Sequence, residues 1–292
     1  MKIGLVFSGG GAKGAYEIGV WKAIRKLKLE EQITVLSGTS VGALNCVLFI
    51  NKDLGKAEKL WRNITIENIS KPTAEFLNSN ILPFVDKLML PQLRTTKKYI
   101  KSVIQKYISL GMISQTELKN IIESNININA INSFKGSCYI CVFNIKMNRP
   151  EYIKINQLTK EKIILYSTAS TAMPLVFDKV IIDDNEYYDG GIPYFGANTP
   201  IMPAVEENCD IIISVITNQW GDFWGKENVP LNTKMWRIAP KEDQWGFIEG
   251  TFDFNSKNIR KRINQGYKEG LVVLEEVKKY IETTCPNKHI AN

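Results

Sequence analysis

The first fifty residues contain two successive strand–turn–helix units, and both turns are rich in glycine. Residues 3–7 form a short apolar run that ends in glycines, and residues 15–29 follow with apolar side chains at helical spacing. An apolar run at residues 33–36 begins the second unit, which continues into a helix at residues 41–50 that is apolar nearly all round. Because buried parallel strands alternate with helices in this way, the pattern predicts an α/β fold.

The rest of the chain continues this alternation around one irregular segment. We expect further strands at residues 138–145, 152–155, 211–216 and 235–238, and further helices at residues 53–62, 159–172, 199–207 and 256–281. A hairpin should occupy residues 179–188, with Asp184 and Asn185 in its turn. Prolines break an oily stretch within residues 63–136, which also contain a basic amphipathic helix at 95–110 and a short helix at 114–123. We predict one domain over residues 1–285, with a helical insert at about 63–136 and a tail at 286–292.

Composition limits the setting in which the chain works. The formal net charge of +7 favours anionic partners such as phospholipid headgroups, although most of the lysines are expected simply to solvate the surface. The N-terminal apolar run is too short for a signal peptide, and no run of about 18 apolar residues would span a membrane. We therefore expect a cytoplasmic protein, with peripheral membrane contact as an open possibility.

The five cysteines do not form a disulfide framework, because they are sparse and odd in number. Cys138 and Cys141 form a C-x-x-C pair within an expected strand. Residues three apart on a strand point to opposite faces, so we expect neither a bridge nor a shared metal ion there. Free, buried thiols in a reducing compartment are the better interpretation.

Residues 38–42 read Gly-Thr-Ser-Val-Gly and join the second expected strand to the second expected helix. In this G-x-S-x-G pattern a serine on a sharp turn projects its hydroxyl into the crevice at the sheet edge. Gly38 and Gly42 allow the backbone to turn without clashes, and the helix N-terminus favours developing negative charge. Ser40 is therefore a candidate nucleophile, although the short pattern alone is a weak signal.

Residues 9–14 read Gly-Gly-Gly-Ala-Lys-Gly and form the first strand-to-helix turn. If the sheet is parallel, this turn lies at the same sheet edge as Ser40. Acyl transfer needs hydrogen-bond donors for the oxyanion of a tetrahedral intermediate. The amides of Gly10 and Gly11, with Gly9 beside them, are candidates for that oxyanion hole. Three glycines can also serve simply to make a tight turn.

A nucleophilic serine needs a base, and the chain has one histidine. His289 lies in a C-terminal tail that is expected to fray, so a Ser-His-Asp triad is implausible and His289→Ala should be nearly silent. The best carboxylate is Asp189, which ends an expected strand and enters a glycine turn that should expose it at the sheet end. An ordinary Asp-Gly turn explains the same residues. The need for a base other than histidine favours Asp189 over Asp183 and Asp184, which we expect to face water.

Residues 9–14, residues 38–42 and the triplet Asp189-Gly190-Gly191, in that order, resemble the motifs of the patatin-like phospholipases. The likeness extends to short stretches on both sides of the aspartate and in the C-terminal third, at residues 167–177, 198–210, 238–240 and 266–267. In the C-terminal third it is to the shorter bacterial members of the family. The resemblance covers roughly residues 1–50 and 137–282 and leaves the insert unmatched.

The resemblance implies a three-layer α/β/α domain with a mainly parallel central sheet, and lipid acyl hydrolase activity without metal or cofactor. Ser40 would attack an ester carbonyl of a phospholipid, lysolipid or similar acyl ester, and Asp189 would take its proton and later activate water. The glycine loop would hold the oxyanion, and Gly14, Gly190 and Gly191 belong to the same motifs. Lys13 fills the basic position of the loop, where it could pair with a headgroup phosphate or simply be exposed at a helix start. Outside the resemblance, the oily residues around 76–93 could be ordinary core, but their prolines indicate loops and slightly favour a role in lining or covering the acyl pocket.

Two other functions remain open. Gly9, Gly11 and Gly14 also fit the G-x-G-x-x-G pattern of a dinucleotide-binding oxidoreductase, which expects an acidic residue at the end of the second strand. Residues 36–40 contain none. A basic scaffold without catalysis is the other alternative, resting on the basic stretches at residues 94–106 and 257–268. Few aromatics interleave with these charges, which disfavours nucleic acid and favours a membrane surface.

Overall fold

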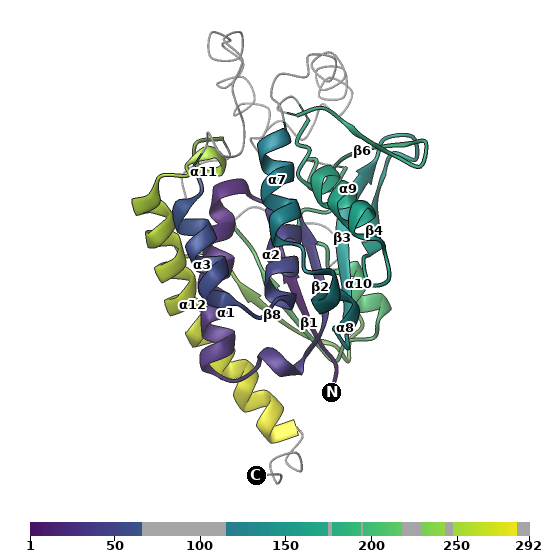
Figure 1. Cartoon of the computed structure of the whole chain (residues 1–292). Coiled ribbons are helices and arrows are strands. Elements are labelled where there is room, and N and C mark those ends of the chain that lie inside the picture. Colours follow the sequence, from purple (N-terminus) through teal and green to yellow (C-terminus); the bar gives the residue numbers. More distant parts are fainter. Residues whose placement is uncertain (66–114, 175–176, 194, 218–228, 243–247, 285–292) are drawn as a thin grey trace, which may run out of the picture.

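The computed structural model, shown in Figure 1, describes residues 1–65, 115–174, 177–193, 195–217, 229–242 and 248–284. Its strands are β1 (Ile3–Phe7), β2 (Ile33–Thr39), β3 (Ser137–Asn144), β4 (Arg149–Lys154), β5 (Val180–Ile182), β6 (Asn185–Asp189), β7 (Ile211–Val215) and β8 (Lys234–Ile238). Its helices are α1 (Ala15–Lys26), α2 (Val41–Ile50), α3 (Leu54–Asn63), α7 (Thr116–Asn125), α8 (Ile128–Ser133), α9 (Lys160–Ser170), α10 (Met202–Glu206), α11 (Ile248–Phe252) and α12 (Ser256–Thr284). Two 3-10 turns, η1 (Gly11–Gly14) and η2 (Glu30–Gln32), precede α1 and β2.

The strands form one sheet in the order β5-β6-β3-β2-β1-β7-β8, and β4 pairs with β3 off this path. β1 pairs in parallel with β2 and β7, and the parallel block continues to β3 on one side and β8 on the other. The antiparallel pairs lie at the β3 side, where β4 and β6 run against β3 and β5 runs against β6. The predicted mainly parallel central sheet is confirmed.

Alternation along β1 divides the apolar core between the two faces of the sheet. Ile3, Leu5 and Phe7 belong to the larger cluster, together with buried side chains of α1, α2 and α12. Val6 belongs to a smaller cluster that includes Ala204 of α10. Because successive strand residues point to opposite faces, helices cover both faces and the α/β/α prediction is confirmed. On the face of the sheet that carries the larger cluster, α1, α3 and α12 pack side by side (Figure 1).

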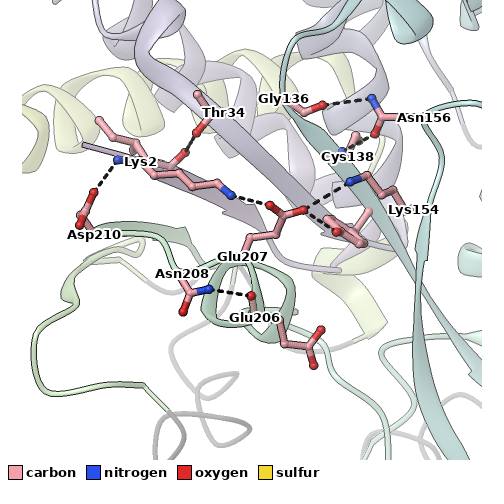
Figure 2. Close-up of polar contacts among 12 residues, drawn as sticks. Lys2, Thr34, Gly136, Cys138, Lys154, Asn156, Glu206, Glu207, Asn208 and Asp210 are labelled. Atoms are coloured by element: carbon pink, nitrogen blue, oxygen red, sulfur yellow. Dashed lines mark hydrogen bonds and ion pairs between the residues drawn. The ribbon is translucent and has the colours of Figure 1, made fainter.

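A polar cluster connects several elements at the end of the sheet where β1 begins (Figure 2). The Lys2 ammonium pairs with the Glu207 carboxylate, which also accepts a 2.7 Å hydrogen bond from the Tyr139 hydroxyl and one from Lys154. Hydrogen bonding from Lys2 is the main cause that lowers the pKa of Glu207 to about 2. The Lys2 amide donates to Asp210 at 2.6 Å. These contacts connect β1, β3, β4 and the residues after α10, at the edge opposite the glycine-rich turns.

Most expected elements occur, and the differences have local causes. β1 and α2 have the predicted bounds, because a predominantly apolar run defines each. The hairpin between β5 and β6 turns one residue earlier than predicted, at Asp183 and Asp184, whose φ angles are 47° and 61°. Aspartate tolerates this left-handed conformation, so the pair forms the turn. The six-residue α8 was missed; Asn127 caps it by accepting a hydrogen bond from the Ala130 amide.

Some expectations lie outside the described residues, namely the oily stretch at 76–93, the basic helix at 95–110 and His289. Within the described part of the chain, no helix is long and apolar enough to cross a membrane. The same residues contain no group of three or more side chains suited to hold a metal ion. Cys46, Cys138, Cys141 and Cys209 are free and buried, as expected for reduced thiols.

Candidate active site

Strand register brings Ser40 and Asp189 to the same level of the sheet. On the parallel pair β2–β3, Thr39 lies opposite Cys141, and on the antiparallel pair β3–β6, Val142 lies opposite Asp189. Ser40 follows Thr39 directly, so it continues level with Val142 and Asp189. The two predicted catalytic residues therefore flank β3 from opposite sides, although they are far apart in the sequence.

Ser40 occupies a strained turn between β2 and α2. Its φ of 56° and ψ of −128° are rare outside glycine, and such a conformation costs roughly 1–3 kcal/mol. Gly38 and Gly42 allow the close turn, because a Cβ on Gly38 would lie 2.3 Å from the Gly42 carbonyl oxygen. The Ser40 amide donates a 2.8 Å hydrogen bond to the Ser170 hydroxyl. The turn thus presents the half-buried Ser40 at the start of α2, where the backbone amides favour developing negative charge.

Asp189 ends β6, as predicted, but the expected exposure of its side chain is wrong, because the residue is 6% exposed. The chain after it folds back over the sheet, with the Ala197 amide donating to the Gly190 carbonyl at 2.7 Å. Burial raises the pKa of Asp189 to about 7, although hydrogen bonds from the Ser40 hydroxyl and the Gly191 amide oppose that rise. The Gly191 amide lies 2.7 Å from Oδ1. A carboxylate held in this way can accept a proton from Ser40 at neutral pH.

The glycine loop lies beside Ser40, as the parallel sheet predicted. A Cβ on Gly9 would be 3.2 Å from the Ser40 Cβ. The Gly9 amide itself donates to the Asn198 carbonyl at 3.0 Å, and its carbonyl accepts from the Thr217 hydroxyl at 2.5 Å. These bonds fix the first glycine of the loop in place and occupy its N–H group.

The amides of Gly10 and Gly11, the next two residues of the loop, differ from the Gly9 amide in their hydrogen bonding. Among the residues that the structure describes, no acceptor pairs with the N–H groups of Gly10 or Gly11. Gly11 has a φ of 56°, and a Cβ there would lie 2.4 Å from the Thr251 carbonyl oxygen of α11. The loop therefore requires glycine at this position, and its Gly10 and Gly11 N–H groups have no acceptor among the described residues.

Lys13 is 3% exposed, so the alternative of a surface lysine at a helix start is wrong. The cause is the packing of η1 against α11 and α12, which cover this turn. Beneath the loop, Asn45 of α2 donates to the Gly14 carbonyl at 3.1 Å and to the Glu17 carboxyl at 2.7 Å. Its carbonyl accepts from the Trp61 indole at 2.9 Å. Asn45 thereby ties the helix that follows Ser40 to the glycine loop.

Glu17 is a fully buried acid beneath this loop. Burial raises its pKa well above the ordinary value, while the hydrogen bond from Asn45 acts in the opposite direction. A neutral carboxyl group is the form that such an interior favours. Glu17 therefore belongs to the support of the site and is a poor candidate for its base.

Comparison with known proteins identifies the family. The chain matches the model of the patatin-like phospholipases over residues 5–205. This chain belongs to the patatin-like phospholipase family. Lysophospholipase nte1 of Aspergillus terreus is 31% identical in an alignment of 94 residues that covers 27% of this chain and 6% of that protein. The crystal structure of VipD from Legionella pneumophila is 15% identical with a TM-score of 0.54, covering 94% of this chain and 66% of that one.

Membership in the patatin-like phospholipase family supports a lipid ester hydrolase and disfavours the dinucleotide-binding oxidoreductase. The matched segments span a small part of the lysophospholipase and about two thirds of VipD, so neither protein's full activity carries over to this chain. The likeness to VipD, at its low identity, bears on the fold alone.

The structure also separates the rival carboxylates. Asp183 and Asp184 lie in the hairpin turn and are exposed, as expected, and Asp183 pairs with Lys162 at 2.7 Å. Sequence reasoning missed the side chains that contact the site from other segments, namely Ser170, Asn198 and Thr217. Ser170 and Asn198 lie in the stretches that flank the aspartate and resemble the patatin-like phospholipases. That resemblance could have pointed to both residues as part of the site.

Proposed function

We propose that this chain hydrolyses carboxylic ester bonds of phospholipids, lysolipids or similar acyl esters with a Ser40–Asp189 dyad. The observation that carries the proposal is the register that sets Ser40 level with Asp189 across β3, beside a buried carboxyl whose pKa burial raises to about 7 and the Ser40 side chain lowers. A general base works best when its pKa lies near the operating pH. Ser40 also has the strained strand-to-helix geometry that nucleophilic serines adopt.

In the proposed reaction, Ser40 Oγ attacks the ester carbonyl carbon while its proton passes to the Asp189 carboxylate. The tetrahedral intermediate collapses, the C–O bond to the alcohol breaks, and Asp189 returns the proton to the leaving oxygen. Asp189 then takes a proton from water, whose oxygen attacks the acyl-enzyme. Collapse of the second intermediate breaks the bond to Ser40 Oγ, Asp189 gives its proton to that oxygen, and the carboxylic acid is released.

The amides of Gly10 and Gly11 are the proposed donors to the oxyanion in both intermediates. Their N–H groups lie in a loop adjacent to Ser40 and have no other acceptor among the described residues. Donors that are fixed before reaction stabilise the developing charge without a reorganisation cost, and one such donor is typically worth about 3 kcal/mol. This mechanism uses groups of the chain alone and requires neither metal nor cofactor.

We further propose that the substrate is presented in an anionic lipid surface near the start of α12. Lys257, Arg260 and Lys261 are exposed there, and the first turn of α12 contains no acidic residue. Cations near a helix N-terminus oppose the helix dipole, so they do not serve the stability of the helix. α12 contacts η1, which places these charges on the side of the glycine loop. Each basic side chain near an anionic membrane contributes about 1 kcal/mol.

Release of fatty acid from phospholipid and lysophospholipid vesicles, beside turnover of a soluble chromogenic ester, tests the function. Ser40→Ala should lower both rates by roughly 10³-fold or more, because nucleophile and base act as a unit. Ser167→Ala is the matched control, since Ser167 is buried and its hydroxyl has no partner among the described residues. Full activity in a folded Ser40→Ala variant would contradict the dyad.

The lipid surface has its own test in the doubly substituted Lys257→Glu/Arg260→Glu variant. We expect weaker sedimentation with vesicles that contain phosphatidylserine, a smaller dependence of binding on salt, and unchanged turnover of the soluble ester. Binding equal to that of the unmodified chain would show that α12 does not contact the membrane.

A further inference from the structure

The last residue of α9 and the two residues after it, residues 170–172, contact both chain segments that carry the proposed dyad. The hydroxyl of Ser170, the last residue of α9, accepts a 2.8 Å hydrogen bond from the Ser40 amide. The same hydroxyl donates a 2.6 Å hydrogen bond to the Cys141 carbonyl of β3. Two residues later, the Ala172 carbonyl accepts a 2.9 Å hydrogen bond from the Asp189 amide. One short stretch of chain therefore holds the nucleophile and the base in relation to β3, the strand between them.

The Ser170 hydroxyl is placed to stabilise a backbone conformation that is unfavourable by itself. Ser40 has a φ of 56° and a ψ of −128°, and its amide would be unpaired in the site without Ser170. An N–H group that is shielded from water and left without an acceptor destabilises the conformation that holds it. Ser170 is completely buried, so water cannot readily replace its hydroxyl. The contact is thus well suited to fix the direction in which the Ser40 side chain leaves the turn.

The segment is itself held rigidly. The Thr171 and Ala172 amides donate to the Thr168 and Ala169 carbonyls at 3.1 and 3.0 Å, which continues the last turn of α9. The Thr171 hydroxyl donates to the Thr168 carbonyl at 2.9 Å. A movement of the Ser40 turn relative to Asp189 would therefore have to break bonds to a segment that α9 and β3 both anchor.

We propose that Ser170 is a positioning residue for the hydrolysis, which fixes the Ser40 hydroxyl against the Asp189 carboxylate through the Ser40 backbone. This inference rests on the proposed function and deepens it. Ser170 does not touch substrate or the reacting atoms in this account, and its effect passes through Ser40. A displacement of about 1 Å between reacting groups can cost roughly 100-fold in rate.

Ser170→Ala removes both hydrogen bonds of the Ser170 hydroxyl. Ser167→Ala is the control on the same helix, because it removes a buried hydroxyl that has no hydrogen-bond partner among the described residues. On the soluble chromogenic ester we expect kcat to fall 10- to 100-fold in Ser170→Ala with KM within a factor of two, whereas Ser167→Ala keeps both values. If Ser170→Ala does not fold, Ser170→Cys, which keeps the volume with a weaker donor and acceptor, is measured in its place.

The pH profile separates positioning from a merely structural role. The hydrogen bond from Ser40 lowers the pKa of Asp189, so a misplaced Ser40 lets that pKa rise further. We expect the acidic limb of kcat/KM to move to higher pH in Ser170→Ala and to stay in Ser167→Ala. Unchanged kcat and an unchanged limb in Ser170→Ala, with Ser40→Ala inactive, would overturn the inference and leave the dyad intact. Full activity in Ser40→Ala would instead overturn the proposed function.

Discussion

Replacement of Asp189 by asparagine should make the protein less active and, at neutral pH, more stable. The folded state holds the Asp189 carboxyl at a pKa of about 7, above its ordinary value of 3.8, and burial is the largest cause. Ionisation therefore favours the unfolded chain. The group costs no stability below pH 3.8, and the cost grows as pH rises until it is complete above pH 7. The interval between the two values corresponds to about 4 kcal/mol as an upper limit.

Asparagine cannot ionise, and its side-chain oxygen can still accept the hydrogen bond from the Gly191 amide. We expect Asp189→Asn to raise the free energy of unfolding at pH 8, by up to about 4 kcal/mol, and by roughly 3 kcal/mol less at pH 5. Urea unfolding at the two pH values measures both numbers. The loss of the base should lower kcat on the soluble ester by roughly 10³-fold or more.

The exposed turn residue Asp183 supplies the control, because Asp183→Asn changes an acid of the same hairpin outside the proposed site. We expect its stability to change by less than about 1 kcal/mol and its kcat to stay the same. A loss of stability in Asp189→Asn at pH 8, or a gain that is equal at pH 5 and pH 8, would refute the reasoning about a buried carboxylate with a raised pKa.

Two further substitutions test the backbone of the site. Ser40→Gly should be more stable than Ser40→Ala by about 1–2 kcal/mol, because glycine accepts the φ of 56° without strain. Equal stabilities of the two variants in thermal unfolding would mean that the turn is not strained. Gly11→Ala should lose roughly 2 kcal/mol of stability and much of its kcat, because the new Cβ meets the Thr251 carbonyl. Gly55→Ala, at an exposed position of α3, should be neutral or slightly stabilising. An unaffected kcat in Gly11→Ala would argue against the loop as the oxyanion site.

The parts of the fold that could be predicted from the sequence are those governed by local patterns. Predominantly apolar runs predicted β1 and α2 with their bounds. Parallel pairing of β1 with β2 then required both glycine-rich turns to meet at one edge, and the short distance between Gly9 and Ser40 agrees with that requirement.

The parts that could not be predicted depend on contacts between distant segments. The burial of Asp189 accompanies a fold of the chain that brings the Ala197 amide back to the Gly190 carbonyl, which no local pattern encodes. Lys13 is buried because α11 and α12, from the other end of the chain, cover η1. The contact between Ser170 and the Ser40 amide likewise joins α9 to the turn after β2. A side chain's partners on such distant elements become visible only in the folded structure.

Covalent labelling with a fluorophosphonate, followed by mass spectrometry of the peptides, is the sharpest test of Ser40 as the nucleophile. The reagent phosphonylates an activated serine, so we predict a single adduct on Ser40 in the unmodified chain, none in Ser40→Ala, and much slower labelling in Asp189→Asn. Ser167→Ala should label at the unmodified rate. An adduct on another residue, or hydrolysis of acyl esters by a chain whose Ser40 stays unlabelled at full reagent occupancy, would contradict the account.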